Sequence, residues 1–283
     1  MATSYLNIVT FLCSTLFYYM AIKPSFTYEV SVDSDKYKAY ISSSYMYLAI
    51  YLLLVIVIQF MVNTSIITST CGGNITENMG AAGVFTFLPW ILIFGVLIVI
   101  LTIYPGFKTA FSDVIGYFWV ASSANKIITE LLVNPDIQKK IDENKESTLE
   151  QKEAMQSAAD AIIKICGNTS ILINQIVPSN FNAYWDILRP LMKEKYQIDN
   201  SESLDIKKEL FEIVVARDNV GEAMWYIYTG LLLTSIVQLK ITTRGCINNP
   251  KTMEQNYQTF LDNEEKAKQQ KDLATSTTYT ITN

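Results

Sequence analysis

The chain of 283 residues contains no histidine, and its four cysteines form no paired motif. Histidine is the commonest general base and a common metal ligand, so its absence removes the usual centre of hydrolytic and metal chemistry. Cys13, Cys71, Cys166 and Cys246 are far apart in the sequence, which excludes the short ligand spacing of a zinc site. Because Cys13 lies in an apolar run and the others are scattered, we expect reduced thiols and no disulfide framework.

Motifs that bind phosphate groups or activate nucleophiles are also missing. The sequence has no glycine-rich nucleotide loop, no P-loop and no G-x-S-x-G element. Acidic residues are frequent in 136–160 and 199–222, but they alternate with lysines, as on solvated helix faces. Asp113 and Glu222 adjoin apolar runs, where we expect each carboxylate to bind an orphan backbone amide at a helix end. We therefore expect a structural protein and not an enzyme, without catalytic, cofactor-binding or metal-binding residues.

Charge is scarce in the first part of the chain. The net charge is −5 and no basic cluster occurs, so the electrostatic footprint of a nucleic-acid-binding protein is missing. From Ala39 to Phe107, 69 residues pass without a lysine or arginine and with a single acid, Glu77. The sequence therefore predicts a membrane anchor over 1–107, a helical domain that is partly apposed to the membrane over 108–273, and a polar tail over 274–283.

Three uncharged apolar runs in the anchor are candidates for membrane spans. A bilayer core about 30 Å thick requires about 20 apolar residues of helix. Residues 45–62 and 84–104 approach or reach this length without a polar face, which a soluble core helix would rarely lack. Residues 5–22 are more polar and lack the basic start and cleavage site of a signal peptide, so we expect a retained membrane helix. Pro89 is expected in the first turns of the 84–104 span, where a missing amide matters least.

Lysines flank the outer ends of the pair of spans 45–62 and 84–104 but are missing from the loop that joins them. The segment before 45–62 carries three lysines and the segment after 84–104 begins with Lys108, whereas the connecting loop, 63–83, carries none. Because basic residues are retained on the cytosolic side, we expect the loop in the lumen and the whole C-terminal part in the cytosol.

Asn-x-Ser/Thr patterns for N-glycosylation begin at Asn63, Asn74 and Asn168. Such short patterns arise often by chance, Asn63 adjoins a span, and Asn168 falls in the cytosolic part. We expect none of the three to be used.

The C-terminal part shows helical periodicity and no sustained strand alternation. The predicted fold class is therefore all-α, with two or three N-terminal transmembrane helices followed by a helical, cytosol-facing domain. Pro105 and Gly106 are expected to end the last span, and 111–132 to form a helix that lies along the headgroups or packs under them. Further helices are expected over 147–167, over 181–197 with a bend at Pro190, from Ser203 onward, and from Pro250 onward.

An uncharged run over 223–239 has two interpretations. It is long enough to be considered as a fourth span, but a span here would place Lys240 and the basic residues after it in the lumen, against the charge bias. We favour a helix buried in the C-terminal domain or lying in the membrane surface, and keep the fourth span as the alternative.

Two stretches, 104–118 and 219–253, carry a pattern of small, aromatic and polar residues. Its members are Pro105, Gly106, Phe111, Ser112, Gly116, Tyr117, Gly221, Glu222, Trp225, Tyr226, Thr229, Gly230, Cys246 and Pro250. The pattern resembles that of a family of membrane-associated structural proteins from large icosahedral DNA viruses of algae and protists (nucleocytoplasmic large DNA viruses). The chain departs from that family at three positions, with Phe107, Ala110 and Asp113 where the family usually has Trp, Pro and Asn.

The resemblance implies a minor capsid or internal-membrane protein that links the virion's inner membrane to the overlying shell. Its implied partners are the lipid bilayer, the major capsid protein and other minor capsid proteins, with self-association left open. Its implied location is a host internal membrane during assembly and then the virion's internal membrane.

Two other roles remain as alternatives. One is an oligomeric channel or transport protein, for which Asn7, Thr10 and Ser14 are the candidate polar residues; the spans contain no ionisable residue to mark an ion pathway. The other is a cellular organelle-shaping membrane protein.

Overall fold

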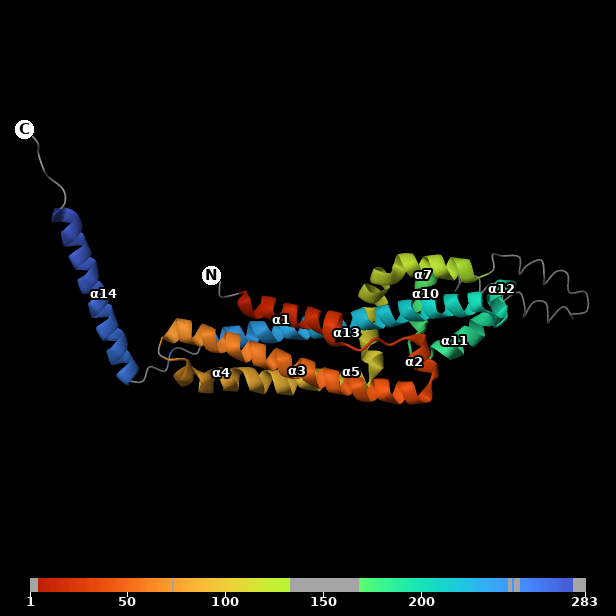
Figure 1. Cartoon of the computed structure of the whole chain (residues 1–283), viewed down its shortest axis with the longest axis horizontal. Coiled ribbons are helices and arrows are strands. Elements are labelled where there is room, and N and C mark those ends of the chain that lie inside the picture. The colour runs from red at the N-terminus through yellow and green to blue at the C-terminus, as the bar shows by residue number, and fades with distance from the viewer. Residues whose placement is uncertain (1–4, 73, 133–167, 244–245, 247–249, 277–283) are drawn as a thin grey trace, which may run out of the picture. The chain divides into compact units, whose positions relative to one another are not determined.

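The computed structural model describes residues 5–72, 74–132, 168–243, 246 and 250–276. Across these residues the chain is almost wholly helical and contains no strand, apart from one isolated bridge between Leu132 and Met192. The all-α fold class is therefore confirmed (Figure 1). The helix expected over 147–167 lies outside the described residues.

The N-terminal part consists of long helices interrupted by π-helical turns. Its elements are α1 (Leu6–Phe17), η2 (Tyr18–Ile22), α2 (Tyr28–Val32), α3 (Ser34–Cys71), α4 (Ile75–Pro89), η3 (Trp90–Gly95) and α5 (Val96–Ile103). Short elements follow: η4 (Pro105–Lys108), α6 (Thr109–Phe111), η5 (Ser112–Gly116) and α7 (Tyr117–Leu131). The remaining described elements are α10 (Thr169–Gln175), α11 (Phe181–Leu188), η6 (Arg189–Leu191), α12 (Glu194–Gln197), α13 (Ser201–Thr243) and α14 (Pro250–Ser276).

Within the described part of the chain, three helical segments are long and apolar enough to cross a membrane: Ser34–Cys71, Ile75–Ile103 and Ser201–Thr243. The first two contain the predicted runs 45–62 and 84–104. The third contains 223–239, so the run for which a buried or surface helix was favoured belongs among the candidate spans. Residues 5–22 form a shorter apolar helix, Leu6–Ile22. The exposed apolar side chains of α3 and α5, such as Leu53 and Ile103, would meet lipid in a membrane protein.

Pro89 lies inside a long helical segment and not in its first turns, so that expectation was wrong. The segment begins at Ile75, because the small and polar residues before Val84 continue the helix although they are not part of the apolar run. Proline lacks an amide hydrogen, and its ring crowds the carbonyl four residues earlier. The π-helical turn Trp90–Gly95 directly follows it, as expected where the regular hydrogen-bond ladder is interrupted.

The segment expected as one amphipathic helix over 111–132 has two apolar faces. Ile128 is buried at 3% exposure, whereas Val114 and Phe118 are 68% and 84% exposed. Phe118 and Ile127, which is 1% exposed, are nine residues apart, which corresponds to about 180° of rotation in a regular helix. One face of α7 therefore enters a protein core, while the other is left exposed.

Proline also ends the helix predicted over 181–197. The structure replaces the expected bend by a break, with α11 ending at Leu188, a 3-10 turn over Arg189–Leu191 and a short α12. The next helix begins at Ser201, two residues before the predicted start.

The chain forms two compact units. Unit 1 comprises Met1–Ser14, Leu53–Ile93 and Leu231–Asn283, and unit 2 comprises Thr15–Leu52 and Phe94–Gly230. The apolar cluster of unit 1 joins α3, α4 and α13 through Ile66, Ile67, Ala82, Val237 and Ile241.

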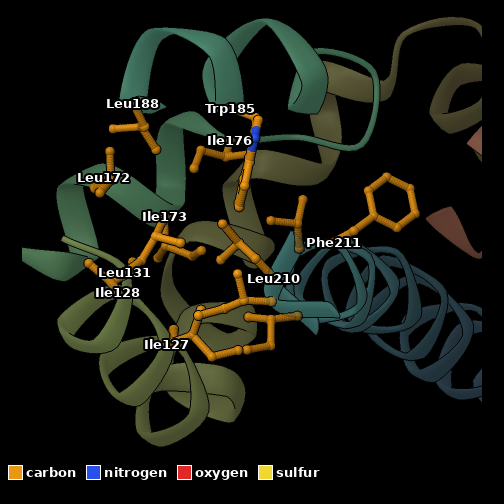
Figure 2. Close-up of a cluster of buried hydrophobic side chains, with 14 of the residues drawn as sticks. Ile127, Ile128, Leu131, Leu172, Ile173, Ile176, Trp185, Leu188, Leu210 and Phe211 are labelled. Carbon is orange, nitrogen blue, oxygen red and sulfur yellow. The ribbon is translucent and has the colours of Figure 1, made fainter. Parts of the chain in front are cut away.

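The core of unit 2 is the larger of the two. Side chains from α7, α10, α11 and α13 point toward one another in it, with Trp185 and Phe211 among the largest (Figure 2). The Phe211 ring is fully buried and makes an edge-to-face contact with Phe181 at 5.0 Å between ring centroids. Phe26 makes a similar contact at 5.4 Å, so this ring joins the N-terminal segment to α11 and α13.

Substitution of Phe211 tests this core. Phe211→Ala removes a fully buried ring, and we expect it to lower the free energy of unfolding of unit 2 by about 3–5 kcal/mol. Ile187→Ala is the control, because Ile187 is 65% exposed and should change stability by less than about 0.5 kcal/mol. Equilibrium unfolding of the full chain in detergent measures both values. Equal effects of the two substitutions would contradict the core assignment.

Candidate functional site: an interhelical ion-pair site

Two glycines bring the segment after α5 against α13. A Cβ atom added to Gly116 would lie 2.6 Å from the carbonyl oxygen of Arg217. A Cβ atom added to Gly221 would lie 2.6 Å from the Cβ of Ser112 and 2.9 Å from the carbonyl oxygen of Lys108. Any larger side chain at either position would separate the two backbones, so both glycines are required for this close approach.

Four charged side chains meet beside these glycines. The Glu222 carboxylate lies 2.6 Å from Lys23 Nζ and 2.8 Å from Lys108 Nζ, and Lys108 also lies 2.9 Å from Asp218. The four side chains are 10–18% exposed. The Tyr19 hydroxyl donates a hydrogen bond to Glu222 Oε1 at 3.0 Å. Two positive and two negative charges therefore compensate each other in a largely dehydrated place.

The two lysines respond differently to this environment. Burial lowers the pKa of Lys108, but the carboxylates of Glu222 and Asp218 raise it by more, so the pKa of Lys108 lies above its usual value. Burial also lowers the pKa of Lys23, and the attraction of Glu222 offsets only part of that effect, so its pKa lies below the usual value. Lys108 differs because it contacts two carboxylates.

The expected roles of Glu222 and Asp113 were wrong. Neither carboxylate is held by an orphan helix-end amide: Glu222 is paired with two lysines, and Asp113 accepts a hydrogen bond from Ser112 Oγ and lies 3.9 Å from Arg217 Nη1. The sequence pattern shows that a charge adjoins an apolar run, but Lys23, which pairs with Glu222, is 199 positions away from it. No local signal could identify that pairing.

Arg217 is a fully buried residue that sequence reasoning missed. Its guanidinium donates to the carbonyl of Ile173, to Asn174 Oδ1 at 3.1 Å and to the carbonyl of Ile176 at 3.0 Å. These acceptors lie at the C-terminal end of α10, where carbonyl groups lack helical partners and a cation is favoured. An arginine amid an apolar helical stretch is the signal that could have found it.

Aromatic residues of the pattern complete the contact between the two stretches. Trp225 Nε1 donates to the carbonyl of Phe107 at 2.8 Å, and the Trp225 ring meets Phe111 edge-on at 5.0 Å. Tyr226 is buried and lies 5.6 Å from the rings of both Tyr51 and Phe94.

The structure therefore unites half of the predicted pattern residues and separates the others. Those brought together are Phe111, Ser112, Gly116, Gly221, Glu222, Trp225 and Tyr226. Pro105 and Gly106 are exposed, Tyr117 packs on the core of unit 2, and Thr229 and Gly230 lie further along α13. Cys246 and Pro250 belong to unit 1.

Cys71 and Cys246 form a disulfide across 175 residues of sequence, so the expectation of reduced thiols was wrong for this pair. The bond also places both residues on the same side of any membrane. The expected arrangement, with Cys71 in the lumen and the whole C-terminal part in the cytosol, is therefore wrong. No sequence pattern indicates this bond, because the two cysteines lie 175 residues apart, one at the end of α3 and the other beyond the end of α13.

A second polar cluster lies in unit 1. Asn7 donates to Asn63 at 3.0 Å, Asn63 donates to Thr86 at 2.8 Å, and Gln59 donates to the carbonyl of Asn7 at 3.0 Å. Thr10 accepts a further bond from Gln59. Hydrogen bonds between polar side chains join membrane helices to one another.

Of the residues expected to line a channel, Asn7 and Thr10 therefore take part in helix–helix contacts, and Ser14 donates to a carbonyl of its own helix. Among the described residues, no group of three or more acidic or cysteine side chains is placed to hold a metal ion. No known family model, curated protein or solved structure matches the chain.

The glycine contact can be tested by adding one methyl group. Gly221→Ala forces a Cβ into Ser112 and the Lys108 carbonyl, and we expect a loss of about 1–3 kcal/mol of stability. Gly106→Ala is the matched control, since a Cβ there meets nothing within 4 Å. Denaturant unfolding of both variants measures the difference. Equal stability of the two variants would show that the close approach is absent.

The ion-pair site can be tested by removing one charge. Glu222→Gln leaves two buried ammonium groups with one carboxylate, and we expect a loss of about 3–5 kcal/mol. Adding Lys23→Met should recover part of that loss, because it removes the uncompensated charge. Glu202→Gln on the same helix is the control: its pair with Lys195 is 47–59% exposed and should contribute less than about 1 kcal/mol. Thermal unfolding at fixed detergent concentration compares the variants, and a neutral Glu222→Gln contradicts the assignment.

Proposed function

We propose that this chain is a structural protein of a virion that contains an internal membrane, and that it links that membrane to the capsid shell. The observation that carries the proposal is the meeting of the two resembling stretches in one site. Their residues supply close backbone contacts, ion pairs and aromatic contacts. These are contacts that join helices, which suits a protein that transmits attachment from a bilayer to a shell.

The proposal includes a membrane topology in which α13 crosses the bilayer. If Ile75–Ile103 returns the chain from the side of Cys71, then Lys108 and the residues after it begin on the opposite side. The disulfide requires Cys246 to be on the side of Cys71 again. Among the described residues between Lys108 and Cys246, α13 is the candidate span. A covalent bond outweighs the statistical bias of Lys240 and the later basic residues toward the cytosol.

In this topology the described residues between Lys108 and the start of α13 face the cytosol, and α14 lies in the lumen. A shell assembled on the cytosolic face would contact the helices that lie between Lys108 and the start of α13. This part of the chain exposes large apolar side chains, including Ile187 of α11 at 65% and Ile198, directly after α12, at 67%. We propose these side chains as contacts with capsid proteins.

Lysine cross-linking of purified virions tests both the function and the topology. We expect the chain in the virion, with cross-links to shell proteins from Lys195, which lies in the exposed pair on the cytosolic side. Lys268 of α14, 72% exposed, should give none, because the bilayer separates it from the shell. Mass spectrometry of the linked peptides makes the comparison. Absence of the chain from virions contradicts the function, while shell cross-links from Lys268 and not from Lys195 invert the topology.

A further inference from the structure

The three Asn-x-Ser/Thr patterns occupy different structural environments. Asn63 is fully buried, and its side-chain amide donates a hydrogen bond to Thr86. Asn168 is exposed and lies in unit 2, directly before α10. Asn74 is exposed between α3 and α4, and the other two residues of its pattern, Ile75 and Thr76, are exposed at the start of α4. Burial therefore excludes the Asn63 pattern. The side of the membrane on which each lies distinguishes the Asn74 pattern from the Asn168 pattern.

The Asn74 side chain is free to react. Asn74 precedes the first residue of α4, but its side chain makes no capping hydrogen bond to that helix. The loop is held instead by Asn78, whose amide donates to the carbonyls of Gly72 and Asn74 at 3.0 and 3.3 Å. Gly72 has a φ of 71°, which ends α3 in the left-handed conformation that glycine favours. The acceptor side chain is therefore presented by a loop that other residues hold in place.

Asn74 also stands clear of the bilayer. The apolar run in α3 ends at Val62, and nine further helical residues lead to Cys71. At 1.5 Å per residue they extend about 13 Å beyond the hydrocarbon. The headgroup layer on each side of a bilayer is about 5–8 Å thick. An enzyme at the membrane surface could therefore reach this loop.

Two independent observations favour a lumenal position for this loop. The loop carries no lysine or arginine, as expected for the side opposite the cytosol. Its neighbour Cys71 is in a disulfide, and such bonds persist in oxidising compartments such as the lumen of the endoplasmic reticulum. Asn168 follows Lys108 on the opposite side.

We propose that Asn74 is an N-glycosylation site, modified in the lumen from a lipid-linked oligosaccharide diphosphate. The Asn74 side-chain nitrogen forms a bond to the anomeric carbon of the sugar. The bond from that carbon to the diphosphate oxygen breaks, the lipid diphosphate leaves with the electron pair, and the amide nitrogen releases one proton. No oxidant or reductant is needed. This site does not depend on the proposed role in a capsid.

Translation of the full chain in the presence of endoplasmic-reticulum microsomes tests the proposal, with endoglycosidase sensitivity as the readout. We expect one glycan on the unaltered chain. Asn74→Gln and Thr76→Ala should each abolish the mobility shift, whereas Thr76→Ser should retain it because serine also completes the pattern. The three changes fall at two exposed residues, Asn74 directly before α4 and Thr76 in its first turn, so loss of folding does not explain a loss of the glycan.

The other two patterns supply matched controls. Ser65→Ala and Ser170→Ala remove the patterns of Asn63 and Asn168 without replacing the asparagine, and both should leave the glycan in place. An unmodified chain, in microsomes that modify a standard glycoprotein, overturns the proposal. So does a shift that persists in Asn74→Gln. Loss of the shift in Ser170→Ala would overturn it and place the helices after Lys108 in the lumen.

Discussion

The pairing of Glu222 with Lys23 and Lys108 is the interaction on which the rest of unit 2 depends. Each of these charges lies next to an apolar helical segment, where water is scarce and an isolated charge would be costly. Together with Asp218 they form a neutral group, with contacts of 2.6–2.9 Å. This pairing holds Lys23, directly after the first apolar helix, and Lys108, at the end of η4, against the same turn of α13.

The glycines and the ion pairs require each other. Lys108 can reach Asp218 and Glu222 because Gly221 lets the Lys108 backbone approach α13. The ion pairs of Lys108 with Asp218 and Glu222 in turn stabilise the close backbone contact, because without it each of these charges would be buried without its partner. Buried ion pairs contribute little net stability compared with apolar packing, but they strongly disfavour arrangements in which a partner is missing. The main effect of the site is therefore to select one register of the helices, and its contribution to total stability is small.

Composition and periodicity were sufficient to predict the helices but insufficient to predict which helices and side chains contact one another. The charge-free runs predicted two long candidate spans, and Pro190 predicted an interruption, because such signals are local. The Cys71–Cys246 bond and the Lys23–Glu222 pair join positions 175 and 199 residues apart, and neither has a spacing that a sequence pattern could show. The π-helical turn after Pro89 was missed because the helix starts earlier than its apolar run.

The length of α13 allows the 223–239 run to be a candidate span although another part of the same helix is buried in a protein core. At 1.5 Å per residue its 43 residues extend about 64 Å, roughly twice the thickness of a bilayer core. One part therefore has a soluble character, with Arg217 and Phe211 buried among other helices, and the other part is apolar enough for lipid. The ion-pair site at 218–222 lies at the boundary between the part of α13 that packs in a protein core and the part that is apolar enough for lipid. Its charges need partners because little water is available there.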